Sequence, residues 1–149
     1  MTVQMPIEDR LALQDLMTAY CYAVDDIGKI EPLLDIFTDD AVLDFRTIGL
    51  PLMNGKGDIR AFFEGVFADM SHHAHYITNF RPEAYDGDTA AMSAYVIGMG
   101  RANDGNEVVA HVRYRFECLR TDAGWKCNNY SMVSMMPVPE SIAEIHGER

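Results

Sequence analysis

The amino-acid sequence predicts a single α+β domain over residues 1–149, in which three N-terminal helices cover a curved, mainly antiparallel sheet and help enclose a cone-shaped pocket. Two observations favour this class. Apolar residues in the first half recur at helical spacing, whereas from residue 72 onward they alternate with a period of two. Turn-forming segments then divide the second half into four strands, so consecutive strands are expected to pair as antiparallel hairpins.

The first helix is predicted over residues 6–24. Pro6 suits the first helical position, and Glu8 and Asp9 suit the positive end of the helix dipole. The turn formers at residues 25–28 end this helix.

A second, shorter helix is predicted over residues 29–37, with Pro32 tolerated only in its first turn. A strand is expected over residues 41–45. Residues 54–57 read as a loop, after which Asp58 is expected to cap a third helix whose apolar positions face inward.

The four long strands are predicted at about residues 72–85, 89–102, 108–120 and 124–136. Asp and Gly residues, with Asn in one case, fill the connections between them and are strong hairpin signals. The tail from Pro137 is expected to leave the sheet and to be available for packing on a neighbouring chain.

Composition narrows the functional classes. The formal net charge is −11 and the 12 basic residues form no cluster, so nucleic acid is not expected as a partner. No apolar run approaches the roughly 18 residues that a membrane span requires, and no secretory signal is evident at the start, so a cytoplasmic protein is predicted. Three cysteines (Cys21, Cys118 and Cys127) without C-x-x-C spacing indicate buried thiols rather than a zinc site or a disulfide framework.

The most polar feature of the chain is the segment His72-His73-Ala74-His75. Strand alternation places His73 and His75 on one face with Ile77 and Asn79, and His72 on the other, so at least one histidine should enter the pocket. A metal site built from His73, His75 and His111 is one alternative. Ordinary surface or hydrogen-bonded histidines are another.

A histidine and an aspartate in an apolar pocket could act together as a general base. Asp25, where the first helix ends, is a candidate partner, although an aspartate at this position is often only a turn residue. An aspartate that accepts the Nδ1 proton fixes the imidazole tautomer and leaves Nε2 free to remove a substrate proton. A tyrosine hydroxyl directed at a carbonyl or a leaving group of the substrate would supply the electrophilic contact that complements this base. Several tyrosines are candidates: Tyr20, Tyr22, Tyr76, Tyr95, Tyr114 and Tyr130.

Three segments resemble the SnoaL-like family of the nuclear-transport-factor-2-like superfamily. They are the opening Ile7-Glu8-Asp9-Arg10-Leu11 with Tyr20 and Asp25, the run His75-Tyr76-Ile77-Thr78-Asn79, and the late Gly124-Trp125-Lys126. The resemblance covers residues 6–136. Within the family, the sequence pattern is similar to that of scytalone dehydratase, bile-acid 7α-dehydratase and hexachlorocyclohexane dehydrochlorinase. It implies a nuclear-transport-factor-2-like cone, and one fold of this kind hosts many reactions.

The resemblance also implies roles for particular residues. Asp25 and His75 match the aspartate and histidine that pair in those lyases, and Tyr20 matches a tyrosine of the bile-acid enzyme. The dehydrochlorinase has an arginine after the last-strand tryptophan, where this chain has Asn128, Asn129 and Tyr130. Tyr130 or Asn129 is therefore expected to bind the substrate in place of that cation.

These expectations favour a cofactor-independent, dehydratase-like lyase that acts on a hydrophobic cyclic small molecule, with catalytic Asp25, His75 and Tyr20 and no metal. An isomerase or cyclase would use the same base. A non-catalytic binding or oligomerising subunit, like the β subunit of ring-hydroxylating dioxygenases, is a further alternative. The resemblance implies a homo-oligomer, either a trimer or a dimer.

Overall fold

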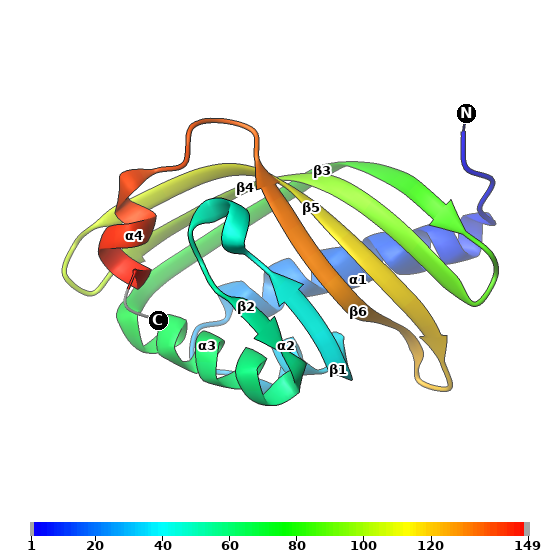
Figure 1. The fold of residues 1–149 in the computed structure, drawn as a ribbon, viewed down its shortest axis with the longest axis horizontal. Coiled ribbons are helices and arrows are strands. Elements are labelled where there is room, and N and C mark those ends of the chain that lie inside the picture. The colour runs from blue at the N-terminus through cyan, green and yellow to red at the C-terminus, as the bar shows by residue number, and fades with distance from the viewer. Residues whose placement is uncertain (1, 148–149) are drawn as a thin grey trace.

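The computed structural model describes residues 2–147 as one six-stranded curved sheet with helices on its concave side and at one end (Figure 1), which confirms the predicted α+β class. The helices are α1 (Ile7–Asp25), α2 (Glu31–Leu34), α3 (Gly55–Asp69) and α4 (Glu140–His146), with a 3-10 turn at Arg46–Ile48. The strands are β1 (Phe37–Asp44), β2 (Leu52–Asn54), β3 (Met70–Tyr85), β4 (Thr89–Ala102), β5 (Glu107–Thr121) and β6 (Gly124–Ser134).

The strand order is β2-β1-β6-β5-β4-β3. The four long strands form the expected antiparallel meander, and β1 joins its far edge in parallel to β6. Figure 1 shows the long strands curving over α1, with α3 and α4 gathered at the end of the sheet where β3 begins. The helices therefore cover the concave face of the sheet, with α1 along its length and α3 and α4 at one end.

Helix α1 fills the concave face because its apolar residues recur every three or four positions. Leu13, Met17, Tyr20 and Val24 are all buried on this stripe. The ring of Tyr20 lies edge-on to that of Tyr130, with centroids 5.0 Å apart, so the middle of α1 is packed directly against β6. None of the helices within residues 2–147 has the combined length and hydrophobicity that a bilayer crossing needs.

The second helix is shorter than expected. It ends at Leu34, and Phe37, which was predicted to be helical, begins β1 instead. Phe37 is buried and pairs with Cys127, whose N–H group donates to the carbonyl of Ile36. Pairing with β6 therefore makes Phe37 part of a strand, although the spacing of the apolar residues over 29–37 favours a helix.

Two other boundaries differ from expectation. Helix α3 begins at Gly55, so most of the residues predicted as a loop form the first turn of the helix. Gly55 itself has a φ of 84°, a backbone conformation that favours glycine. Asp58 lies inside that turn, and its carboxylate accepts the backbone N–H of Asn54 at 2.9 Å. The short strand β2 and the helix α4 were not predicted.

The N-terminal end of α1 is attached to the sheet through Asp9. Its carboxylate accepts hydrogen bonds from Tyr85 Oη (2.5 Å), Arg120 Nη2 (2.9 Å) and Trp125 Nε1 (3.2 Å). The hydrogen bonds from Arg120 and Tyr85 lower the pKa of Asp9 to about 2. Asp9 thus connects α1 to β3, β5 and β6 at the end of the molecule away from the pocket.

We expect Asp9→Ala to lower the free energy of unfolding by about 1–3 kcal/mol, because it leaves the donors of the buried Trp125 and the half-buried Tyr85 unpaired. Since the folded pKa lies below the ordinary 3.8, the contribution is present above that pH and is lost as the pH falls toward 2. Urea unfolding at pH 7 and at pH 2–4 measures both effects. Glu8→Ala, which removes an exposed carboxylate from the same helical turn, is the control. Equal effects of the two substitutions at pH 7 would contradict this role for Asp9.

Candidate active site

Asp25 and His75 lie side by side where α1 meets β3. Asp25 Oδ1 accepts a hydrogen bond from Nδ1 of the imidazole at 2.6 Å, and Oδ2 accepts the backbone N–H of His75 at 2.9 Å. The His75 side chain is 14% exposed and that of Asp25 27% exposed. Because the carboxylate can only accept, Nδ1 of His75 carries a proton, and Nε2 is the ring nitrogen that this contact leaves available to a ligand.

Glycines on the neighbouring strand make room for this ring. Gly98 pairs with His75 across β3 and β4, and Gly100 pairs with His73. A Cβ atom at Gly98 would lie 3.1 Å from both Cδ2 and Nε2 of His75. The Cδ2 and Nε2 atoms of the imidazole therefore lie over a backbone position that has no side chain.

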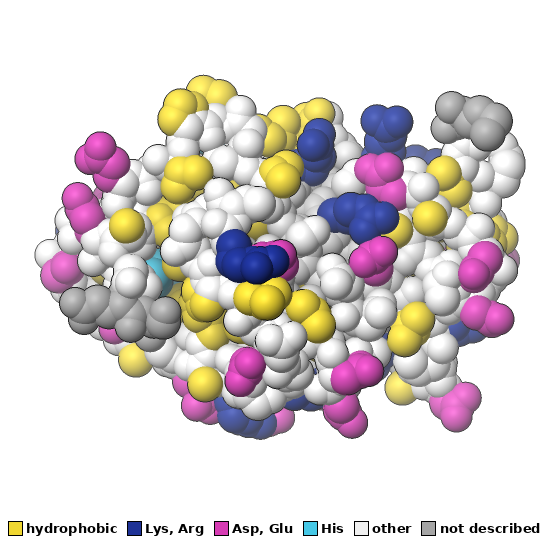
Figure 2. All heavy atoms as spheres, viewed as in Figure 1, with side chains coloured by type: hydrophobic (Ala, Val, Ile, Leu, Met, Phe, Trp, Pro, Cys, Tyr) yellow, Lys and Arg dark blue, Asp and Glu magenta, His cyan; other side chains and the backbone are white. Residues whose placement is uncertain are grey.

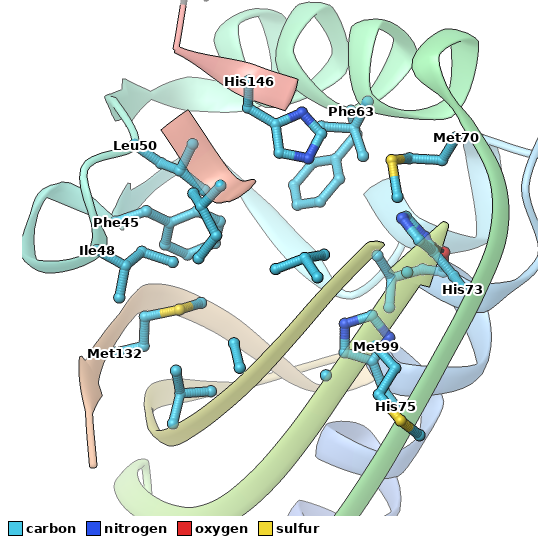
Figure 3. A pocket seen from close by; sticks show the side chains of 18 of the residues that line it. Phe45, Ile48, Leu50, Phe63, Met70, His73, His75, Met99, Met132 and His146 are labelled. Carbon is cyan, nitrogen blue, oxygen red and sulfur yellow. Dashed lines mark hydrogen bonds between the residues drawn. The ribbon is translucent and has the colours of Figure 1, made fainter. Parts of the chain in front are cut away.

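The two histidines open into a cavity of about 120 Å³ (Figure 3). Most of its wall is aromatic or aliphatic, with Phe45, Ile48 and Leu50 on the side facing the histidines. Asp25 stands behind His75 and does not line the cavity. An engineered protein cavity of roughly 150 Å³ holds benzene, so this space matches a molecule with a single ring.

His73 is a second imidazole in the same wall. Its Nδ1 lies 2.8 Å from the carbonyl oxygen of Val24 and must carry the proton, because a carbonyl can only accept. Burial lowers the pKa of His73 below its ordinary value, so the ring is held neutral with Nε2 unprotonated. Both His73 and His75 thus enter the pocket, whereas His72 points to the outer face of the sheet.

The alternative metal set of His73, His75 and His111 is not assembled. His111 is exposed on β5, where its neighbours Ala110 and Val112 are the residues that face the pocket. Within the described part of the chain, no group of three or more His, Cys, Asp or Glu side chains is arranged to hold a metal ion. The three cysteines are buried and free, as their spacing predicted.

Three tyrosines, one each from α1, β5 and β6, pack together beside the pocket. Tyr20 and Tyr114 line the pocket, and Tyr130 is fully buried behind them, with its ring centroid 5.0 Å from each. Burial raises the pKa of all three hydroxyls well above the ordinary value, so they remain neutral hydrogen-bond donors. The structure therefore brings Tyr20 into the pocket wall but sets Tyr130 one layer back from it.

Asn129, which was expected to bind the substrate, lies outside the pocket. A β-bulge falls at Asn128, because Cys118 pairs with Cys127 while the adjacent Glu117 pairs with Asn129. The extra residue reverses the alternation of β6, so Tyr130 points inward and Asn129 faces the outer surface. A similar bulge at Asn79, which has a φ of 56°, removes that residue from the face of His73 and His75.

His146 is a pocket residue that the sequence analysis did not identify. The tail after Pro137 leaves the sheet as expected and folds back as α4, which places Ile142 and His146 in the pocket wall. The spacing of these two residues, four apart after Pro139, was an available sign of a short amphipathic helix. Gly98 and Gly100 were also not identified, whereas Tyr114 was one of the candidate tyrosines and lines the pocket.

Charged side chains do not form a binding surface on the face shown in Figure 2. Lys and Arg side chains there are scattered among Asp and Glu side chains, with no continuous positive area. The interior of the pocket is likewise poor in charge, since the described lining holds histidines and no Lys, Arg, Asp or Glu. The site is suited to a small and mostly apolar ligand.

Comparison with known proteins gives a family match and close relatives. The family model described as SnoaL-like domain matches residues 5–131. An uncharacterized protein of Mycobacterium tuberculosis is 31% identical over 123 residues, which is 80% of this chain and 81% of the relative.

Solved structures share the fold closely. A protein of Novosphingobium aromaticivorans, described as a proposed aromatic ring hydroxylase, is 54% identical with a TM-score of 0.93 over 95% of this chain and 99% of its own. A hexachlorocyclohexane dehydrochlorinase is 23% identical with a TM-score of 0.77 over 87% of each chain. At that identity, the second similarity shows the fold alone.

We expect Gly98→Ala to displace the His75 ring, because the new methyl group would lie 3.1 Å from two ring atoms. The hydrogen bond to Asp25 should lengthen or break, with an overpacking cost of about 1–3 kcal/mol. The low-field proton NMR signal of His75 Nδ1–H, together with urea unfolding, measures both changes. Gly57→Ala is the control, since no heavy atom lies within 4 Å of a Cβ there. An unshifted Nδ1 proton in Gly98→Ala would show that the glycine does not set the ring position.

Proposed function

The chain belongs to the SnoaL-like domain family, and we propose that within this family it is a cofactor-independent lyase, dehydratase-like, acting on a small hydrophobic cyclic molecule. The observation that carries the proposal is the hydrogen bond of 2.6 Å between Asp25 and His75 at the edge of an apolar cavity. A carboxylate behind an imidazole, with the free ring nitrogen toward a water-poor space, is the arrangement of a general base.

In the proposed reaction His75 Nε2 removes a proton from a carbon next to a carbonyl group. Asp25 holds Nδ1–H and stabilises the imidazolium that forms, without becoming protonated itself. The electron pair of the broken C–H bond forms a C=C bond as the adjacent C–O bond breaks. The proton on His75 then passes to the leaving hydroxide, so the products are the alkene and water.

Tyr20 is proposed to supply the electrophilic contact. Its hydroxyl stays neutral because burial raises its pKa, and the residue lines the pocket as His75 does. A neutral donor toward the carbonyl oxygen stabilises the negative charge that develops during proton removal. Tyr114 lies in the same wall and could share this role, whereas Tyr130 supports both rings from behind.

A second candidate function follows from the 54% identical relative, whose description names aromatic ring hydroxylation. Under this reading the chain would bind an aromatic ring in the same cavity and serve as a subunit of a larger hydroxylating assembly. Isomerisation or cyclisation by the same base is the other alternative. Direct proton removal is favoured over a subunit role by the Asp25–His75 pair, which binding alone does not require.

We also propose that the chain forms a homo-oligomer, a trimer or a dimer, through the outer face of the sheet. Tyr76, Ile97, Val109 and Val133 are 39–61% exposed there on four adjacent strands. Tyr76 and Ile97 are directly paired across β3 and β4. Several exposed apolar side chains on one face of a sheet are typical of an interface between copies.

The lyase proposal predicts that the protein accelerates loss of water from 3-hydroxycyclohexanone, a single-ring probe, to give 2-cyclohexenone. His75→Ala and Asp25→Asn should each reduce the rate by about 10²–10⁴-fold, because the base or its orientation is lost. Ultraviolet absorbance of the conjugated ketone follows the reaction, and circular dichroism checks the fold. His72→Gln, on the same strand but the opposite face, should keep full activity. Wild-type rates in His75→Ala would rule out the proposed base.

The oligomer proposal predicts that Ile97→Asp shifts the protein toward the monomer, because a buried interfacial charge is costly. Analytical ultracentrifugation at several concentrations measures the change. Ile7→Asp, which alters an exposed isoleucine on α1, is the matched control and should leave assembly unchanged. A wild-type monomer at all concentrations would contradict the proposal.

A further inference from the structure

The C-terminal helix α4 contributes a polar group to the pocket that the proposed reaction does not use. His146 comes from the last turn of α4 and is only 9% exposed, and it lines the same cavity as His73 and His75. Figure 3 shows its ring entering from the end of the pocket opposite His75. Ile142, one turn earlier, is also buried in this wall, so α4 forms part of the site and not a loose tail.

One nitrogen of His146 lacks a hydrogen bond. Nδ1 is buried, and no residue in the described range 2–147 donates to it or accepts from it. Nδ1 is too deeply buried for a ligand in the cavity to reach it, so Nε2 is the nitrogen through which the ring can meet a ligand. Burial also lowers the pKa of His146, so the ring is neutral and carries one donor and one acceptor nitrogen.

The opposite end of the pocket offers a different set of groups. Nδ1 of His75 donates to Asp25 and Nδ1 of His73 donates to the Val24 carbonyl, so Nε2 is the nitrogen that each ring leaves for a ligand. Nε2 of the neutral His73 ring can accept a hydrogen bond, and the hydroxyls of Tyr20 and Tyr114 can donate one. Between the two ends the wall is apolar, and the cavity of about 120 Å³ leaves room for one ring.

We propose that His146 is a ligand-binding residue, and that the pocket takes a single-ring molecule with two polar substituents, one at His73 and His75 and a second, a hydroxyl, at His146. A hydroxyl fits because it donates and accepts, as a neutral imidazole does. The inference rests on the pocket being the site of the proposed function and adds the class of its ligand. Helix α4 would then select ligands by their second substituent, through His146.

Equilibrium binding of phenol and the three benzenediols tests the proposal, measured by calorimetry under argon to prevent oxidation. These aromatic probes cannot undergo elimination, so the result does not depend on turnover. The wild-type protein should bind at least one diol about tenfold more tightly than phenol, the gain expected for one added buried hydrogen bond. On addition of that diol the ¹⁵N signals of the His146 ring should shift, and phenol should leave them nearly unchanged.

His146→Leu should remove the preference for the diol and change the affinity for phenol by less than twofold. His146→Gln keeps a polar group and should retain part of the preference, which separates lost recognition from misfolding. Glu144→Gln, an exposed change on the same helix, is the control and should behave as wild type.

The proposal is overturned if no diol binds more tightly than phenol, if His146→Leu keeps the diol preference, or if it weakens phenol and diol equally. Failure of the lyase proposal has a different signature, namely unchanged turnover of 3-hydroxycyclohexanone in His75→Ala. The two outcomes are therefore distinguishable.

Discussion

The contact of one carboxylate with two N–H groups of a single residue organises this molecule. Asp25 accepts both the ring Nδ1–H and the backbone N–H of His75, so it fixes where the imidazole lies and which nitrogen is protonated. The acid comes from α1 and both donors come from β3, so the contact also joins the helix layer to the sheet. The position of the His75 ring at the pocket edge, with Nε2 available to a ligand, is a direct consequence of how these two layers meet.

Much of this arrangement could be predicted from local patterns. The buried stripe of α1 and the alternation of the long strands are periodic over many residues, and the hairpin turns have distinctive compositions. Asp25 and His75 were singled out by the resemblance to SnoaL-like lyases, because their positions at the end of the first helix and near the start of the first long strand left the choice among the histidines open. The distance of 2.6 Å between Asp25 Oδ1 and His75 Nδ1 could not be predicted from the sequence, because it depends on how α1 is placed on the sheet.

The features that were missed depend on distant contacts. Phe37 joins a strand because β6 is available to pair with it, and nothing near it in the sequence shows this. A single extra residue at Asn128 exchanges the faces of Asn129 and Tyr130, and such a bulge has no reliable local signature. His146 enters the pocket only because the chain turns back after β6, so its neighbours lie far away in sequence.

Helix α1 is secured at both ends, by Asp9 at one and by Asp25 at the other. With 19 residues it is roughly 28 Å long, so the Asp9 hydrogen bonds influence the Asp25–His75 pair through the whole length of the helix. Loss of the Asp9 hydrogen bonds would shift the Asp25 carboxylate relative to the His75 ring, although both residues would still be present. Substitutions at the hairpin ends beside Asp9, far from the pocket, would then change the geometry of this pair without removing either of its members.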